Sequence, residues 1–392
     1  MGKVNYIKLG DACKFINGDR GINYPKVDEF VQQGIPFINT GHIEKNKIIF
    51  SDMNYITQEK YSALSSGKVS KGDVVYCLRG SLGKHAIVEI DLGAIASSLV
   101  ILKPNHNLVI SKYLLYVLDS KDIEIQQLKA NNGSSQPNLS ASSVKEFIIP
   151  LPNMDIQKKI VTILDKAQSL IDKRKEQIEA CDELVKSLFY EMFGDPVKND
   201  KGWKISRLDE LGRLERGKSK HRPRNAPELL NGPYPLIQTG DVSNAGLYIT
   251  NYTSTYSEVG LKQSKMWPSG TLCITIAANI AKTAILTFDA CFPDSVVGFT
   301  ENESSNKMFI QIWMTFLQQM LEETAPESAQ KNINLKILNE LSVITPPLSL
   351  QNKFAAQVEK IEQQKKLLEQ SFKELENNFN SLMQRAFKGE LF

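Results

Sequence analysis

The densest group of chemically capable side chains in the sequence is a basic stretch that begins just after its midpoint. Within twelve positions it holds six arginine or lysine residues, opposed only by Glu215, and Pro223 interrupts any regular element there. Guanidinium and ammonium groups at this density suit binding of phosphate oxygens, and arginine also suits the paired acceptors of a guanine edge. A solvated surface loop is the alternative interpretation. The stretch contains Arg213, Arg216, Lys218, Lys220, His221, Arg222 and Arg224.

A second set of polar candidates occupies turns. Residues 40–42 (Thr-Gly-His) and 239–241 (Thr-Gly-Asp) place a hydroxyl group beside a polar side chain that differs between the two segments. This fits a shared frame with different base-contacting groups, although a strand-end turn explains it as well. Turn and helix-cap chemistry is likewise the alternative for the loops around residues 136 and 331. The candidates are Arg20, Thr40, His42, Arg79, Lys84, His85, Gln136, Asn138, Thr239, Asp241, Asn279, Lys282, Lys331 and Asn332.

Residues 212–219 match the GxxxxGK[ST] pattern of nucleotide-binding phosphate loops. A loop of that kind follows a buried strand and opens a helix. Here the polar pair Asp209 and Glu210 stands just before the segment, and Pro223 prevents a helix from following it. We therefore do not expect nucleotide binding.

Other catalytic patterns are incomplete. Asp294 with Glu301 and Glu303 imitates the acidic cluster of a nuclease, but a glutamate stands where the catalytic lysine belongs. The prolines at 346–347 follow a threonine and precede a leucine, so the Asn-Pro-Pro-aromatic motif of methyltransferases is missing. The four histidines show no metal-ligand spacing. The sequence therefore predicts no catalytic, cofactor or metal site.

Composition places limits on the architecture. A chain of 392 residues exceeds what one hydrophobic core usually organises, which predicts two domains. Its formal charge of +3 is mild, so any contact with an anionic polymer must come from local patches. The five cysteines are scattered, as expected of reduced thiols in the cytoplasm. Apolar runs are too short for a membrane span.

The sequence contains an internal duplication. Residues 36–43 recur in similar form as residues 235–242, and Gln157 recurs as Gln351. Matching blocks keep their order and nearly their spacing along the whole chain, which indicates a duplicated unit of about 200 residues. Each copy begins with short β-rich runs and glycine turns, then changes to a helical period after a proline pair.

The helical part of each copy has an apolar residue every three or four positions over about four heptads, which is typical of a coiled coil. A long amphipathic helix packed only on its own domain is the alternative. The positions expected to pair the helices are Ile160, Leu164, Ile171, Ile178, Val185 and Leu188 in the first copy, and Phe354, Val358, Ile361, Leu368, Phe372, Leu375, Phe379 and Leu382 in the second.

We therefore predict an α+β protein with four parts. Globular domains occupy residues 1–153 and 195–346, and coiled-coil helices occupy residues 154–194 and 347–392. Two tandem copies associate most simply around a pseudo-two-fold axis, which makes the helices antiparallel and separates the globular domains.

The ordered set of these features resembles the specificity (S) subunits of type I restriction-modification systems. The resemblance covers the whole chain and is carried by residues 150–160, 188–196 and 386–391 around the helices, and by residues 38–41 and 237–240 in the globular parts. It implies two target-recognition domains, each binding one half of a split, asymmetric site on double-stranded DNA.

The resemblance also implies the partners. The helices would set the distance between the half-sites and bind modification subunits, two in number, which supply S-adenosylmethionine and methyl transfer. Whether a restriction subunit joins stays open. The chain itself would be a cytoplasmic, non-catalytic subunit. Two alternatives remain, a stand-alone modification enzyme and a coiled-coil adaptor without DNA sequence preference.

Overall fold

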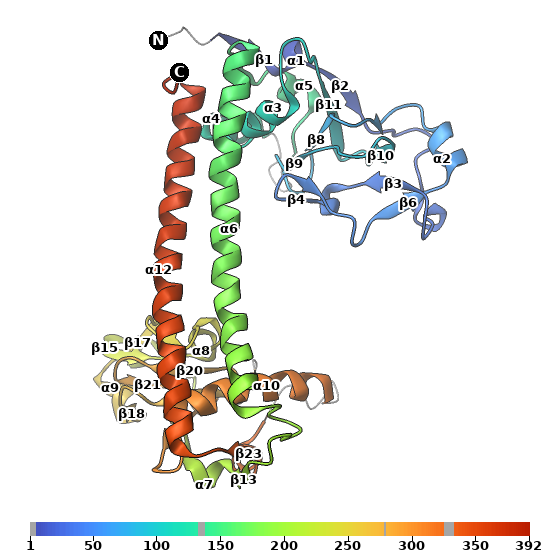
Figure 1. The fold of residues 1–392 in the computed structure, drawn as a ribbon. Helices are drawn as coiled ribbons and strands as arrows, with labels where there is room; N and C mark the ends of the chain where they lie inside the picture. Colours follow the sequence, from blue (N-terminus) through green and yellow to red (C-terminus); the bar gives the residue numbers. More distant parts are fainter. Residues whose placement is uncertain (1–4, 132–137, 278–279, 325–332) are drawn as a thin grey trace. The chain divides into compact units, whose positions relative to one another are not determined.

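The computed structural model describes residues 5–131, 138–277, 280–324 and 333–392, and the side chains of all of these except 318–324. The chain divides into two compact units, each built from segments far apart in the sequence (Figure 1). Unit 1 comprises Met1–Lys175 and Gln370–Phe392, and unit 2 comprises Glu176–Glu369. Each unit therefore contains one globular part and a piece of both long helices.

The globular part of unit 1 is mainly β-structure. Its strands are β1 (Tyr6–Lys8), β2 (Cys13–Asn17), β3 (Ile35–Ile38), β4 (Ile43–Glu44), β5 (Lys47–Ile48), β6 (Asn54–Ile56), β7 (Lys68–Val69), β8 (Val74–Cys77), β9 (His85–Ile87), β10 (Gly93–Ile95), β11 (Leu99–Pro104) and β12 (Ile148–Pro150). Its short helices are α1 (Leu9–Ala12), η1 (Val27–Glu29), η2 (Thr40–His42), α2 (Gln58–Ala63), α3 (Ser111–Leu118), α4 (Lys121–Ala130) and α5 (Ala141–Lys145).

Two four-stranded sheets form the frame of unit 1. One has the order β2-β11-β8-β9 with antiparallel neighbours, and the other has the order β6-β3-β10-β7, in which β3 and β10 run parallel. Strands β8 and β11 are almost continuous apolar runs because nearly all of their side chains are buried. Strand β1 pairs with β12, which joins the start of the globular part to its end. Strands β4 and β5 form a separate hairpin.

Unit 2 repeats this frame. Its strands are β13 (Lys204–Arg207), β14 (Gly212–Arg216), β15 (Leu230–Leu236), β16 (Tyr248–Ile249), β17 (Ser254–Tyr256), β18 (Met266–Trp267), β19 (Leu272–Thr275), β20 (Thr283–Leu286), β21 (Ala290–Cys291), β22 (Val296–Glu301) and β23 (Ser342–Thr345). Its short helices are α7 (Leu208–Leu211), η3 (Pro227–Leu229), α8 (Thr239–Asn244), α9 (Glu258–Lys262), α10 (Lys307–Thr324) and α11 (Leu335–Asn339).

Strand order shows that the two units are copies. The sheet β14-β22-β19-β20 corresponds to β2-β11-β8-β9, with β16 added at its edge, and β17-β15-β21-β18 corresponds to β6-β3-β10-β7. The parallel pair β3 and β10 recurs as β15 and β21, and the closing pair β1 and β12 recurs as β13 and β23. This confirms the internal duplication predicted from the sequence.

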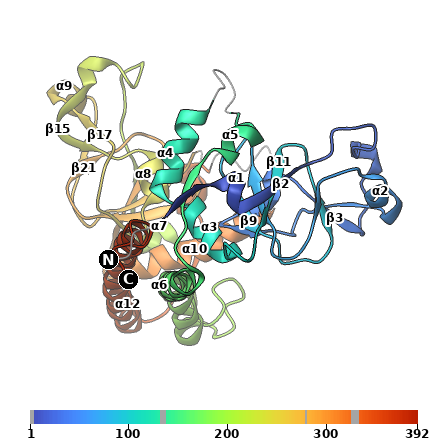
Figure 2. The ribbon, with the colours of Figure 1, turned by 90° about the horizontal axis from the view of Figure 1, so that it is seen from above.

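Two helices of 40 residues each, α6 (Met154–Phe193) and α12 (Leu348–Phe387), pack side by side (Figure 2). In unit 1 the buried Leu164 of α6 belongs to the same core as Phe387 of α12. In unit 2 Phe189 of α6 meets Phe354 of α12, with ring centroids 5.6 Å apart. Because the start of each helix lies beside the end of the other, the pair is antiparallel, as predicted.

The apolar heptad positions of both helices are shielded from solvent. All fourteen residues expected to pair the helices, from Ile160 to Leu382, are buried or half-buried. Leucines outside that series, such as Leu170 and Leu367, are more than half exposed. Lys365, where the second apolar stripe is interrupted, donates a hydrogen bond to Asp182 of α6 at 2.6 Å. None of the described helices is long and apolar enough to cross a membrane.

A buried glutamine ties each long helix to its globular part. The side chain of Gln157 accepts a hydrogen bond from the Ile110 amide at 3.0 Å and donates to the carbonyl oxygens of Leu108 and Pro152, at 2.8 and 2.9 Å. Gln351 repeats the arrangement with the Asn306 amide, at 2.9 Å, and two carbonyl oxygens. The oxygen and both N–H groups of each amide are bonded inside the chain, which fixes each helix start on its domain.

A glycine just after β2 and β14 allows the next loop to lie against a neighbouring turn. A Cβ atom on Gly18 would stand 2.5 Å from the Ala96 carbonyl oxygen, and one on Gly217 would stand 2.3 Å from the Phe292 carbonyl oxygen. Such distances are far inside van der Waals contact, so only glycine fits. The same close approach in both units places the loops that begin at residues 17 and 216.

We expect Gln157→Met and Gln351→Met to lower the free energy of unfolding by roughly 1–3 kcal/mol for each buried backbone partner left unsatisfied. Methionine keeps the volume of the side chain but removes its amide. Urea unfolding followed by circular dichroism measures the effect. Gln363→Met, at an exposed position of α12, is the matched control. An equal loss at Gln363 would contradict a special role for the buried pair.

We expect Gly217→Ala to destabilise unit 2 by roughly 1–3 kcal/mol, because the added methyl group must displace backbone of the neighbouring turn. Thermal denaturation measures the change. Gly240→Ala is the control, since a Cβ at Gly240 meets nothing within 4 Å. Equal melting temperatures for the two variants would show that the loop tolerates a wider separation.

Candidate nucleic-acid interface

Several of the described candidate residues lie near one edge of the sheet that contains the parallel strands. In unit 1, β3 and β10 end at this edge and lead into the turns at residues 39–42 and 96–98. In unit 2, β15 and β21 end at the corresponding edge and lead into residues 238–241 and 293–295. The loop after β2 or β14 reaches the same edge. Three chain segments therefore meet there in each unit.

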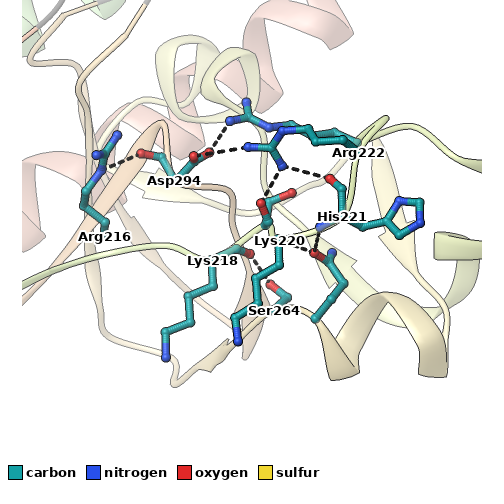
Figure 3. Close-up of polar contacts among 10 residues, drawn as sticks. Arg216, Lys218, Lys220, His221, Arg222, Ser264 and Asp294 are labelled. Atoms are coloured by element: carbon teal, nitrogen blue, oxygen red, sulfur yellow. Dashed lines mark hydrogen bonds and ion pairs between the residues drawn. The ribbon is translucent and has the colours of Figure 1, made fainter.

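Asp294 organises the basic loop of unit 2, residues 216–224 (Figure 3). Its backbone oxygen accepts a hydrogen bond from Nε of Arg216 at 2.9 Å. Its carboxylate pairs with the guanidinium groups of Arg222, at 3.6 Å, and of Arg224. Arg222 also donates to the carbonyl oxygen of Ser219 at 2.6 Å. Two arginines are thus held at the carboxylate of Asp294 and the third at its backbone oxygen, and all three side chains are exposed.

The lysines of the basic loop are held only through their backbone. Gln263 accepts a hydrogen bond from the Lys220 amide at 2.6 Å, and the Ser264 hydroxyl donates to the Lys218 carbonyl at 2.8 Å. Their side chains extend away from Asp294 (Figure 3), and no ion pair joins them to another described residue. Neighbouring His221 is exposed, with its Nε2 3.9 Å from Glu228. The loop therefore presents two free ammonium groups beside three ordered guanidinium groups.

Arg213 does not belong to this group. It lies on β14 and pairs with Glu215, which also pairs with Lys265. Hydrogen bonding to Lys265 is the main reason that the pKa of Glu215 lies below its usual value. Because residues 212–216 form strand β14, the match to a phosphate loop is accidental, as the sequence context predicted.

The corresponding loop of unit 1, residues 17–24, is held by similar contacts but carries less charge. Buried Asp19 accepts hydrogen bonds from the Gly21 and Ser65 amides, both at 2.7 Å, and these amides lower the pKa of its carboxyl group. The Ser66 hydroxyl donates to the Asn17 carbonyl at 2.9 Å, one residue before Gly18, whereas Ser264 in unit 2 donates to the carbonyl one residue after Gly217. Arg20 is exposed and donates to the Ser97 carbonyl at 3.3 Å.

His42 and Asp241 perform the same local task in the two units. The Asn39 amide donates to Nδ1 of His42 at 3.1 Å, and the Gln238 amide donates to the Asp241 carboxylate at 2.7 Å. His42 is buried, its Nε2 lies 3.1 Å from the Asp52 carbonyl, and burial lowers its pKa. Both ring nitrogens are therefore occupied inside the chain, so we leave His42 out of the proposed interface.

Thr40 and Thr239 are half-buried beside these caps. The Thr40 hydroxyl lies 3.2 Å from the Ser98 hydroxyl, in the turn that Arg20 also contacts. The Thr239 carbonyl accepts a hydrogen bond from Ser243 at 2.7 Å. Thr40 thus lies at the same edge as Arg20, half-buried in that turn.

The hairpin between β8 and β9 adds further residues to the edge of unit 1. Leu78 donates through its amide to the Ser98 carbonyl at 2.9 Å, which brings the exposed Arg79 next to that turn. Arg79 forms an isolated bridge with Asn138. Lys84 is exposed on the same hairpin. Arg20, Thr40, Arg79, Lys84 and Asn138 therefore belong to one neighbourhood.

Two other candidates on these hairpins are more enclosed. His85 is buried, with its ring nitrogens 2.7 and 3.2 Å from the carbonyl oxygens of Gly83 and Leu115 and a contact to Asp119 at 3.4 Å. We leave it out of the interface for the reason given for His42. Lys282 is half-buried and its amide donates to the Thr275 hydroxyl at 3.1 Å.

Four candidates lie outside the described residues, namely Gln136, Asn279, Lys331 and Asn332. Asp294 is not among the candidates, because an acidic residue 70 positions beyond Arg224 gives no local sequence signal of a contact with the basic loop. Among the residues that the structure describes, no three histidine, cysteine, aspartate or glutamate side chains are placed to hold a metal ion.

Comparison with known proteins agrees with this arrangement. The family model described as type I restriction modification DNA specificity domain matches residues 1–180 and again residues 200–377. The type I restriction enzyme MjaIX specificity subunit of Methanocaldococcus jannaschii is 23% identical over 359 residues, covering 86% of this chain and 82% of the relative. The HindI specificity subunit of Haemophilus influenzae is 20% identical over 440 residues, covering 90% and 94%.

Solved structures show the same fold. A chain from a study of complex assembly and conformational transition of the type I R-M system matches with a TM-score of 0.62 at 18% identity, covering 100% of this chain and 99% of that one. The S subunit of a type I restriction-modification system from M. genitalium matches with a TM-score of 0.56 at 15% identity, covering 98% and 96%. With two matches of the family model that together span most of its length, the chain belongs to the type I restriction modification DNA specificity domain family.

Proposed function

We propose that this chain is the DNA-recognising subunit of a type I restriction-modification complex, and that each unit binds one half of a split, asymmetric site on double-stranded DNA. The observation that carries the proposal is the pair of equivalent loops at the same sheet edge, residues 17–24 and 216–224, which begin at the same close approach of a glycine but present different charges. Two copies of one frame with different exposed groups suit two different half-sites.

The exposed groups of unit 2 divide between two kinds of contact. Lys218 and Lys220 are flexible point charges, which suit phosphate oxygens. Arg222 and Arg224 are fixed by Asp294, and an ordered guanidinium fork suits the O6 and N7 acceptors of guanine. We therefore assign sequence preference mainly to the arginines and general affinity mainly to the lysines.

The chain is proposed to bind two modification subunits through its helices and to carry no catalytic site or cofactor of its own. Methyl transfer from S-adenosylmethionine would belong to the modification subunits, because the sequence lacks the motifs of a methyltransferase. The five cysteines are free and buried, which supports a cytoplasmic location.

The long helices are proposed to set the distance between the half-sites. Each unit takes core residues from both α6 and α12, so the helices connect the two recognising parts through their own length. An α-helix rises about 1.5 Å per residue, and a helix of this length gives a defined span.

We expect Arg222→Ala and Arg224→Ala to weaken binding of the cognate duplex by about 1–3 kcal/mol and to relax base choice in one half-site, because a bidentate contact to guanine is lost. Lys218→Ala and Lys220→Ala should weaken all duplexes alike and reduce the slope of log affinity against log salt by about one each. Titration of the complex with cognate and scrambled duplexes at several salt concentrations measures both effects.

Two further variants test the division. Arg207 is an exposed arginine on strand β13, away from the basic loop, and it forms an ion pair with Asp209. The Arg207→Ala variant should therefore leave DNA binding unchanged. Asp294→Asn should raise affinity for scrambled DNA while reducing the preference for the cognate site. If affinity and base choice were unchanged in all the variants of Arg222 and Arg224, the loop would be a solvated surface element without a role in DNA recognition.

We expect removal of one heptad from each helix, residues 177–183 and 362–368, to shorten the unread spacer between half-sites. Lys365 and Asp182 pair across these segments, so the double deletion keeps the helices matched and the apolar stripes in phase. It shortens the helix pair by about 10 Å, which is about three base pairs. Methylation mapping in cells that also carry the modification gene measures the number of base pairs between the two half-sites.

A deletion of only three residues from α6 is the control, because it breaks the heptad phase and should impair assembly with the modification subunit. If the double deletion left the spacer and the methylation activity unchanged, the helices would not set the distance.

A further inference from the structure

Ile22 stands out in the loop of unit 1 because its side chain is 96% exposed. Isolated exposed apolar residues are common, but near-complete exposure of an isoleucine is uncommon because its burial is worth about 1.5–3 kcal/mol. The corresponding loop of unit 2, residues 216–224, contains no large apolar residue. At the same place in the fold, unit 1 therefore exposes an apolar side chain and unit 2 exposes basic side chains.

The exposure of Ile22 is imposed by its neighbours. Asp19 holds the Gly21 amide at 2.7 Å, and the Tyr24 amide donates to the Gly21 carbonyl at 3.0 Å. The Asn23 side chain donates to the Ala63 carbonyl at 2.9 Å. Because the residues on both sides of Ile22 are tied to the domain, its side chain cannot turn inward without breaking these bonds.

The surroundings of Ile22 identify the kind of surface it would meet. Arg20, two residues earlier, is exposed and bonded to the Ser97 carbonyl at 3.3 Å, and Asp19 is buried within the loop. Arg20 is therefore the one exposed charge of residues 17–24. An apolar group beside a guanidinium group matches the major-groove edge of a DNA base step, where a thymine methyl lies next to hydrogen-bond acceptors.

We propose that Ile22 contacts the 5-methyl group of a thymine, so that the half-site bound by unit 1 contains an A·T pair at that position. This inference rests on the proposed function of the chain as a DNA-recognising subunit. It makes the two half-sites chemically different, one selected by an apolar contact and the other by ordered arginines. Val27 is also 88% exposed, but it lies beyond Tyr24 and Pro25, in η1, and is not adjacent to Arg20.

The experiment replaces each thymine of the mapped recognition site with deoxyuridine, one position at a time. Deoxyuridine keeps every hydrogen-bonding group and lacks only the methyl group. The complex of this chain with its modification subunit is titrated with each duplex. At one position in one half-site, loss of the methyl should weaken wild-type binding about four-fold, the value expected for burial of one methyl group.

The Ile22→Ala complex should bind the thymine and deoxyuridine duplexes equally at that position, and Ile22→Val should retain most of the difference. Leu92→Ala is the matched control, because Leu92 is an exposed apolar residue (42%) just before β10, at the end of that strand opposite the interface. It should keep the full wild-type difference.

Two results would overturn the inference. One is that no thymine position responds to deoxyuridine in the wild-type complex, or that the response persists in Ile22→Ala. The other is that Ile22→Ala reduces capture of the modification subunit while DNA binding per assembled complex is unchanged, which would make Ile22 a protein contact. Failure of the proposed function is seen separately, as a wild-type complex without preference for the mapped site over scrambled DNA.

Discussion

The structure depends on one constraint, which is that neither globular part completes its hydrophobic core without both long helices. In unit 2 the rings of Phe189 and Phe193 from α6 lie 5.6 and 5.2 Å from Phe354 of α12, inside the domain core. In unit 1 Phe387 of α12 lies 5.8 Å from Tyr113 of the globular part. Helix pairing and domain folding are therefore one event, and the antiparallel direction follows from which helix end each core requires.

A frame fixed in this way leaves its exposed loops free to differ. Gln157 and Gln351 hold the helix starts with the same three hydrogen bonds. Gly18 and Gly217 let the loops after β2 and β14 approach the neighbouring turn equally closely. Even the cap at the end of the parallel strand keeps its geometry when a histidine in one copy is replaced by an aspartate in the other. The exposed side chains of the two loops can therefore differ while the frame that holds them stays the same, which is what a two-part recognition protein needs.

The structural features that arise from a repeat or a period in the sequence could be predicted from it. The duplication is a repeat, the apolar heptads are a period, and the loop at residues 217–224 follows from local composition, and the structure has each of them. Residues 213–216 are expected in the same loop but form the end of β14, because they pair with β22. The sequence could not show that Asp294 pairs with Arg224, because the contact is made by a turn 70 positions away. It also could not separate a cap from a base-contacting group at His42, because a polar residue at a strand end serves either role and only burial distinguishes them.

The position of Asp294 has a further consequence for how the basic loop can act. A carboxylate within reach of Arg222 and Arg224 repels a phosphate group that approaches the same guanidinium face, so these arginines are poorly suited to general electrostatic binding. A guanidinium group has five N–H donors, and the carboxylate uses only part of them. The remaining donors can meet neutral acceptors, such as those of a base edge, without competing with Asp294. Lys218 and Lys220 carry no such restriction. In the proposed function, the charges of this short loop are thus divided between lysines that attract the polymer and arginines that choose its sequence.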